Sequence, residues 1–203
     1  MTKKATGKPG LRGKKTLLLR NYDLFIERQA RLSITAESSW DYSSDDASMK
    51  MELLILDDLT IFAIRARRLL ELCGLTSSAN RVKISPLRFN AQAKECIYER
   101  MDRQALGFET LLNRIIHMAN FEYFHSWSFL QTYLGVKLDL YESFVRFKEG
   151  ENRMDGVMFL HDKRNGTAFY FLKDIIKASI EVADAIVETC SNADVAIELS
   201  FRV

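Results

Sequence analysis

Residues 107–133 read GFETLLNRIIHMANFEYFHSWSFLQTY, and this stretch sets the expected architecture. Apolar residues recur three and four positions apart in its first half, which is the pattern of a helix with one buried face. Gly107 can break the preceding segment, and Glu109 lies in the first turn, where a carboxylate suits the positive end of a helix. The second half is dense in aromatic residues, which are typical of a core seam between a helical layer and a sheet. Stacking of bases on these rings is the alternative.

The same helix carries the side chains that are candidates for chemistry. Asn113 and His117 follow Glu109 at intervals of four residues and share a face with it, and Arg114 neighbours His117. An amide, a guanidinium and an imidazole on one helix surface could grip a phosphate and transfer a proton near neutral pH. The structural alternative is that His117 bonds to Glu109 or to a carbonyl, while the stem of Arg114 covers apolar surface.

Length and composition describe a globular chain. Its 203 residues suit one domain, 47% of them are hydrophobic, and the net charge of +2 is too small for a strong claim that the whole molecule binds nucleic acid. We expect no signal peptide and no membrane span, because no apolar run is long enough. Three widely spaced cysteines, Cys73, Cys96 and Cys190, favour a reducing, cytoplasmic compartment. No metal-spaced histidines, phosphate loop or dinucleotide fingerprint occurs, so we expect neither a metal nor another cofactor.

The first 15 residues, MTKKATGKPGLRGKK, are basic and contain no acid. Glycine and proline interrupt any helix here, so we expect a flexible arm before a single domain over 16–203. The arm could contact RNA phosphates without sequence preference, and the alternative is a solubilising tail. The side chains that would contact RNA are Lys3, Lys4, Lys8, Arg12, Lys14 and Lys15.

The segment 16–134 predicts a helical bundle. Apolar residues recur at helical spacing with charged residues between them, and Gly74 is the expected C-cap of the longest helix. The expected elements are a helix over 16–37, a loop over 38–48, a central helix over 49–73, a connection over 76–90 and a helix over 91–103.

Three arginines, Arg65, Arg67 and Arg68, cluster near the end of the expected central helix. Cations suit the negative end of a helix. We therefore interpret the cluster as a partner of the helix dipole and prefer this interpretation to an RNA-binding patch.

The segment 136–203 predicts a small antiparallel sheet with a helix on it. Asn165 and Gly166 form a strong hairpin turn signal, and Asp174 is the expected N-cap of a final helix that runs to about Cys190. Expected strands cover 138–148, 157–161, 167–171 and the alternating tail 195–203. The predicted fold class is α+β, mainly α: a helical bundle followed by a small antiparallel sheet, built on a hairpin, and a C-terminal helix.

The order of elements, with N-R-I-I-H at 113–117 and R-N-G in the hairpin, resembles uncharacterised bacterial proteins that carry an N-[KR]-I-I-H helix. More distantly, the helical part is similar to HEPN domains. Active members of that superfamily are metal-independent RNases, often dimers, and many serve toxin or phage-defence systems. For an RNase, the resemblance implies that His117 is the general base toward a ribose 2′-hydroxyl, that Arg114 holds the phosphate and that Asn113 positions the substrate.

The match to the HEPN pattern is incomplete. His117 fits the histidine and Asn113 fits the polar residue of that pattern, which leaves Leu112 where active members have arginine. Members without this arginine often serve as binding or dimerisation modules. The resemblance therefore implies a non-catalytic interaction or regulatory module, with a protein partner or a homodimer, in bacterial defence. The alternative is a metal-independent RNase that acts on RNA as a toxin or phage-defence effector.

Overall fold

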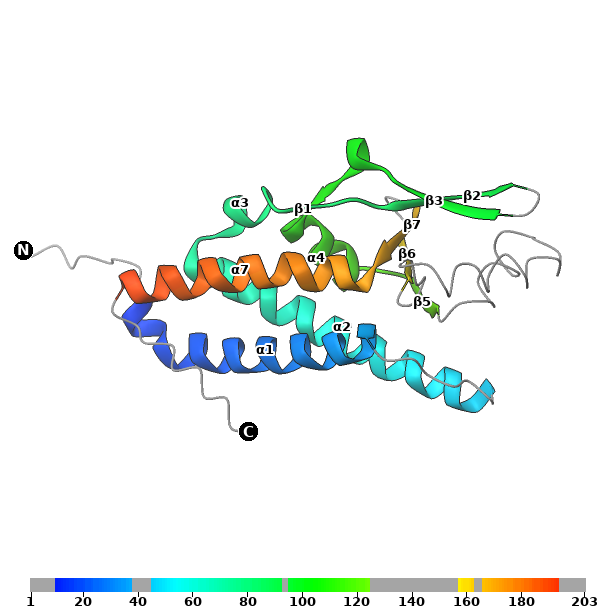
Figure 1. The fold of residues 1–203 in the computed structure, drawn as a ribbon. Coiled ribbons are helices and arrows are strands. Elements are labelled where there is room, and N and C mark those ends of the chain that lie inside the picture. Colours follow the sequence, from blue (N-terminus) through cyan, green and yellow to red (C-terminus); the bar gives the residue numbers. More distant parts are fainter. Residues whose placement is uncertain (1–9, 38–44, 93–94, 125–156, 163–165, 194–203) are drawn as a thin grey trace, which may run out of the picture.

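The computed structural model describes residues 10–37, 45–92, 95–124, 157–162 and 166–193 (Figure 1). Over these residues the chain is α+β and mainly α, with a small antiparallel sheet and a C-terminal helix, which confirms the predicted fold class. The helices are α1 (Lys15–Glu37), α2 (Asp45–Cys73), α3 (Thr76–Ala79), α4 (Phe108–Ile116) and α7 (Leu172–Asn192), with 3₁₀ segments η1 (Leu11–Lys14) and η2 (Asp102–Gln104). The strands are β1 (Lys83–Ile84), β2 (Leu87–Gln92), β3 (Glu95–Arg100), β4 (Leu106–Gly107), β5 (Asn120–Phe124), β6 (Val157–Asp162) and β7 (Gly166–Phe171).

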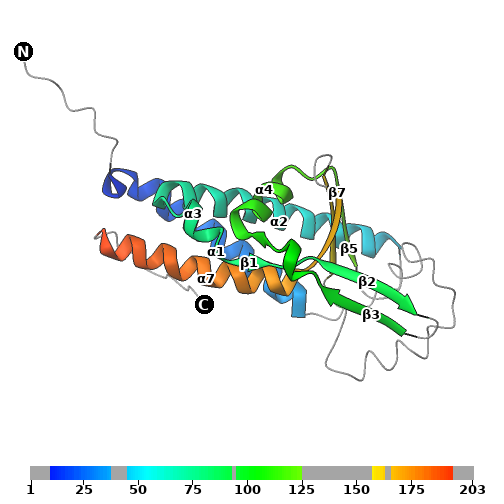
Figure 2. The ribbon, with the colours of Figure 1, turned by 90° about the horizontal axis from the view of Figure 1, so that it is seen from above.

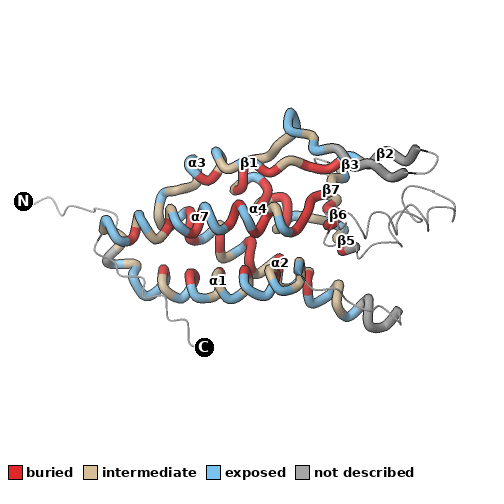
Figure 3. Tube along the Cα trace, viewed as in Figure 1, coloured by how far each residue is buried: buried red, intermediate tan, exposed pale blue. Residues whose placement is uncertain are grey.

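The hydrophobic core lies between the helices. α1 and α2 pack side by side, α7 runs along them, and α4 packs on α2 (Figures 1 and 2). The ring of Phe62 in α2 stacks on Phe25 of α1, with 5.2 Å between centroids, and meets the edge of Phe108 of α4 at 6.4 Å. All three side chains are fully buried, and Figure 3 shows buried residues facing one another across these helices. Phe62 of α2 therefore contacts both α1 and α4, and the three helices share one core.

Two polar contacts fix the helices relative to one another. The Gln29 amide of α1 donates a buried hydrogen bond of 2.7 Å to the Ser179 hydroxyl of α7. Arg28 of α1 forms an ion pair with Asp58 of α2. Because buried polar groups are costly without partners, these contacts favour one alignment of the helices over a slipped one.

Gly74 ends α2 as predicted. Its φ is +70°, in the left-handed region that favours glycine, and the Leu75 N–H donates to the Leu70 carbonyl at 2.9 Å. This pattern is that of a helix closed by a glycine C-cap. α2 therefore stops at Cys73, and the chain turns into α3.

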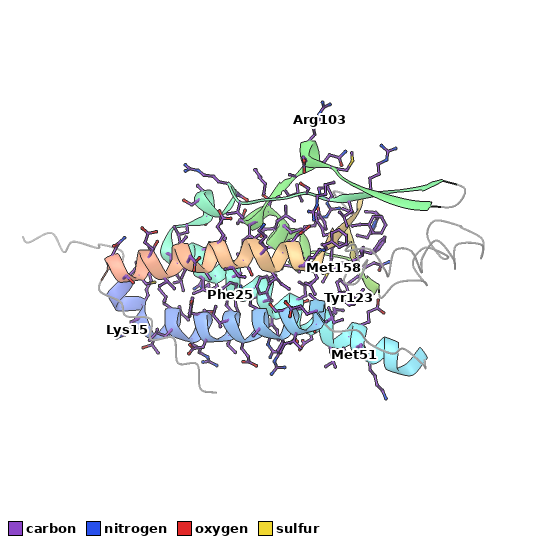
Figure 4. The ribbon with its side chains drawn as sticks, viewed as in Figure 1. Lys15, Phe25, Met51, Arg103, Tyr123 and Met158 are labelled. Atoms are coloured by element: carbon purple, nitrogen blue, oxygen red, sulfur yellow. The ribbon has the colours of Figure 1, made fainter. Side chains whose placement is uncertain are left out.

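The main sheet has the strand order β3-β2-β7-β6-β5, and all its pairs are antiparallel. The predicted hairpin is confirmed: β6 and β7 pair from Val157 with Phe171 to Asp162 with Gly166, which has a φ of +69°. β5 pairs with β6, and Figure 4 shows the paired residues Tyr123 and Met158 side by side near α2. The Tyr123 N–H donates to Glu52 of α2 at 2.9 Å, which attaches this edge of the sheet to the bundle.

The helix expected over 91–103 is wrong. Residues Leu87–Gln92 and Glu95–Arg100 form an antiparallel hairpin, and β2 joins β7 through the pair of Leu87 and Phe169. Ile97 and Tyr98 have high strand propensity. Pairing of β3 with the adjacent β2 favours the strand over the helix. The expected division into a bundle over 16–134 and a sheet over 136–203 also differs from the structure. β2, β3 and β5 all precede residue 134.

Three boundaries are also corrected. α2 starts at Asp45, inside the expected loop. Phe171, not Asp174, is the N-cap of α7, and Asp174 lies in the first turn, where it forms an ion pair with Arg100 at 2.5 Å. The expected flexible arm also ends earlier, because Leu11 in η1 packs against the core. The strands expected over 138–148 and 195–203 lie outside the described residues.

Candidate functional site

The predicted site helix, α4, is held at its N-terminus by Asn80, the residue that follows α3. The Asn80 side-chain oxygen accepts hydrogen bonds from the Thr110 N–H at 3.1 Å and the Thr110 hydroxyl at 3.2 Å. Gly107, the N-cap of α4, lies directly against Asn80: a Cβ at this position would be 2.4 Å from the Asn80 Oδ1 atom. The close approach explains why a glycine precedes this helix.

Asn113 belongs to this same polar network. Its side-chain amide donates to Glu109 Oε1 at 2.6 Å, and Asn80 donates to Glu109 Oε2 at 3.2 Å. Glu109 and Asn113 therefore share a helix face, as the spacing predicts. Glu109 bridges two amides in this network, and neither contact involves His117.

Arg114 points into the protein. Its side chain is 8% exposed, and the guanidinium donates to the Gly166 carbonyl at 2.6 Å and to the Tyr170 hydroxyl at 3.4 Å. Both acceptors lie on β7, at the turn and along the strand of the hairpin. Arg114 therefore ties α4 to the β6–β7 hairpin, and its neighbour Leu112 is fully buried.

His117 is the C-cap of α4 and is exposed to solvent. Its backbone N–H donates to the Asn113 carbonyl at 3.1 Å, whereas its imidazole makes no hydrogen bond to any described residue. The structural alternative of a buried His117 bonded to Glu109 does not occur. The three candidate side chains thus have three environments: a polar network for Asn113, the hairpin for Arg114 and solvent for His117.

A second candidate site is a hollow of about 380 Å³ on the bundle, and the sequence indicates only its three arginines. We call it the basic groove. It is lined by Leu17 and Asn21 of α1, by Ile64, Arg65, Arg67, Arg68 and Glu71 of α2, and by Ile116 of α4. The described residues of the lining thus include three arginines and one acid. Ile116, which also lines the groove, directly precedes His117 in the sequence.

The arginines of the basic groove are not partners of the helix dipole, which corrects the sequence-based interpretation. The last turn of α2 contains no basic residue, and the dipole effect fades beyond that turn. Arg67 and Arg68 both bond to Glu71 at 3.2 Å, while Arg65 donates to the Asn21 side-chain oxygen at 3.2 Å. The groove could be found from sequence only if the helix pairing were known, since three separate elements line it.

Two thiols meet near the same end of the bundle. Cys73, at the end of α2, and Cys190, in α7, are both free, and Cys190 is fully buried. Burial, and then the neighbouring Cys190 thiol, raise the pKa of Cys73 to about 12. Burial also raises the pKa of Cys190. Both groups are thus held as neutral thiols, which are poor nucleophiles.

The expected RNA-binding residues are only partly described. Lys14 is half-buried in η1 and Lys15 is exposed at the start of α1 (Figure 4). Lys3, Lys4 and Lys8 lie outside the described residues, as does the side chain of Arg12. Their proposed contact with RNA remains a prediction.

Comparison with known proteins identifies no relative: no family model, no curated protein and no solved structure matches the chain. Within the described ranges, no group of three or more histidine, cysteine or acidic side chains is placed to hold a metal ion. No described helix has the length and apolar character that a membrane span requires. The geometry of α4 and of the basic groove therefore carries what can be inferred about function.

Proposed function

We propose that the protein is a non-catalytic interaction module, a degenerate relative of HEPN domains that regulates through association. Bacterial defence is the setting that the resemblance implies. The observation that supports the proposal is the position of Arg114, whose guanidinium is buried and bonded to the hairpin at Gly166 and Tyr170. A guanidinium that is bonded to the hairpin in this way is not available to bind a substrate phosphate beside the exposed imidazole of His117.

The alternative function is a metal-independent RNase, and one observation favours it: His117 is exposed, as a general base must be. In such an enzyme His117 would take the proton of a ribose 2′-hydroxyl. The phosphate would then need a cation other than Arg114, and the basic groove, whose lining includes Ile116, offers three arginines.

The experiment compares the parent protein with His117→Ala and with Arg103→Ala as the control. Arg103 is exposed on η2 and lies far from α1 and α2 (Figure 4). Each protein is incubated with mixed RNA, with and without a chelator, and thermal unfolding is measured in parallel. We expect no cleavage that depends on His117, and an unchanged melting temperature in His117→Ala, because the imidazole is exposed.

Chelator-resistant cleavage by the parent, lost in His117→Ala and kept in Arg103→Ala, would overturn the non-catalytic function. Cleavage that persists in His117→Ala does not use His117 as the general base, and it therefore gives no support to the HEPN-type RNase. The melting temperatures separate both results from loss of the fold.

A further inference from the structure

The basic groove combines exposed aliphatic side chains with guanidinium groups. Leu17 is 43% exposed and Ile64 is 45% exposed, and both line this one hollow. Ile116 lies beside them and packs partly on the core. Aliphatic side chains left in water on two adjacent helices gain free energy when another apolar surface covers them.

The charge of the basic groove is not balanced within it. Arg67 and Arg68 both bond to the single carboxylate of Glu71, and their side chains are 39% and 52% exposed. Exposed pairs of this kind contribute little to stability, so carboxylates from another molecule can join or replace them at little cost. The groove therefore favours an anionic ligand.

Arg65 adds donors at the floor of the groove. Its guanidinium donates to the Asn21 side-chain oxygen at 3.2 Å, and its Nε atom is buried without a hydrogen-bond partner among the described residues. The terminal N–H groups that do not bond to Asn21 are the donors that a ligand oxygen could use. Arginine suits a carboxylate in this role, because its planar fork can donate two parallel hydrogen bonds.

We propose that the basic groove binds an acidic amphipathic helix of a partner protein, which names the partner class of the interaction module and rests on that proposed function. The arginine-bearing side of the groove follows α2 from Ile64 to Glu71. These eight residues rise about 10 Å along the helix axis, which matches about two turns of a facing helix. Leucine or isoleucine side chains of the partner, three and four residues apart, cover Leu17 and Ile64, and its flanking carboxylates face the arginines.

RNA fits the groove less well than an acidic helix does. Single-stranded RNA is held by cationic grooves that also offer aromatic side chains for base stacking. Among the described residues that line the basic groove none is aromatic, and the apolar ones are aliphatic. A peptide that carries both carboxylates and aliphatic side chains matches both components.

The test selects ligands without assuming a partner. A phage library of random peptides of about 16 residues, which span about 24 Å as helices, is panned on the purified full chain. Counter-selection uses Arg67→Glu/Arg68→Glu, whose two altered side chains are 39% and 52% exposed, so that little buried contact is lost. Arg103→Glu is the matched control, since it reverses an exposed arginine away from the groove.

Synthetic copies of the enriched peptides are then titrated against each protein by fluorescence anisotropy. We expect sequences rich in Glu and Asp, with leucine or isoleucine three and four residues apart. Their affinity should fall at least about tenfold in Arg67→Glu/Arg68→Glu, a difference that titration resolves easily, and stay the same in Arg103→Glu. Ile64→Gln should weaken binding as well, and this single change keeps the test informative if the double variant unfolds.

Three results of the peptide assays would overturn the proposal. They are enriched peptides that lack acids, equal binding to parent and double variant, and displacement of the peptide by single-stranded RNA that binds the groove more tightly. A groove that holds a second copy of the chain would appear as a dimer that Arg67→Glu/Arg68→Glu dissociates, and it would also overturn it. If the groove does not bind such peptides, the proposed function as an interaction module is unaffected. If RNA is cleaved in a way that depends on His117, the proposed non-catalytic function is itself contradicted.

Discussion

Loss of the hydrogen bonds that the Arg114 guanidinium makes should lower the stability of the protein measurably. We expect Arg114→Met to lower the free energy of unfolding by about 1.5–3 kcal/mol, the range for hydrogen bonds to charged groups. The methionine retains the apolar stem, so the loss reports the contacts with Gly166 and Tyr170. Urea unfolding at neutral pH measures the change.

Arg103→Met serves as the control, because an exposed side chain on η2 should contribute within about 0.5 kcal/mol. Equal stability of parent and Arg114→Met would show that α4 does not depend on the hairpin contact. The main observation behind the non-catalytic proposal would then be lost as well.

The raised pKa of the Cys73 thiol predicts that the folded protein becomes less stable in alkaline solution. Its pKa rises from an ordinary 9.0 to about 12 in the folded protein, through burial and then the neighbouring Cys190. Below pH 9 both the folded and unfolded states keep the proton. Between pH 9 and pH 12 only the unfolded state releases it, so the free energy of unfolding falls as the pH rises.

Unfolding in urea with a reductant, measured at several pH values from 8 to about 10.5, tests this linkage. Cys73→Ala should show a shallower fall than the parent, since one of the two buried thiols is gone. Identical pH dependence in the two proteins would contradict the assigned environment of Cys73.

The start of α4 depends on close packing between two elements. A Cβ on Gly107 would lie 2.7 Å from the Asn80 Cα atom, so the backbone must shift to accept a side chain. We expect Gly107→Ala to lower the free energy of unfolding by about 1–3 kcal/mol, as overpacking does. Gly10→Ala is the matched control, because no atom lies within 4 Å of a Cβ added there.

Thermal unfolding of both glycine variants measures the difference. If Gly107→Ala melts with the parent, then Asn80 can move away from α4, and its capping role is not essential.

Elements with a strong local signal could be predicted from the sequence. Gly74 ends α2 and Gly166 closes the hairpin, because each adopts a positive φ that few other residues accept. The hairpin Leu87–Arg100 could not be predicted in the same way. Its apolar residues fit a helix and a strand equally well over so short a run, and the choice depends on the pairing of β2 with β3 and with β7.

The candidate site shows the same limit. Spacing alone correctly places Asn113 beside Glu109, since both belong to one helix face. It does not show that Arg114 turns toward Gly166, which lies 52 residues further along the chain. Nor does it show that Leu17 and Ile116 flank the arginines of α2, because helix packing brings them together.

In the whole molecule, the sheet and the described chain ends lie at opposite ends of the helices (Figures 1 and 2). Residues 1–9 have little apolar content, so we expect their deletion to leave the melting temperature nearly unchanged. Deleting residues 1–14 should lower it, because Leu11 packs against the core. Differential scanning calorimetry of both truncations distinguishes the two effects, and equal melting temperatures would show that η1 is dispensable.

The basic groove opens near the end of the bundle where α1 begins and α7 finishes, since Leu17 and Glu71 belong to its lining. A ligand attached through a short linker to the start of η1 or to the end of α7 would therefore be held close to the groove. Short flexible linkers give effective concentrations in the millimolar range. A peptide that binds only weakly as a separate molecule would then occupy the groove almost completely when fused. Cleavage of the linker would release it, so that proteolysis, rather than synthesis of a partner, would set when the surface becomes available.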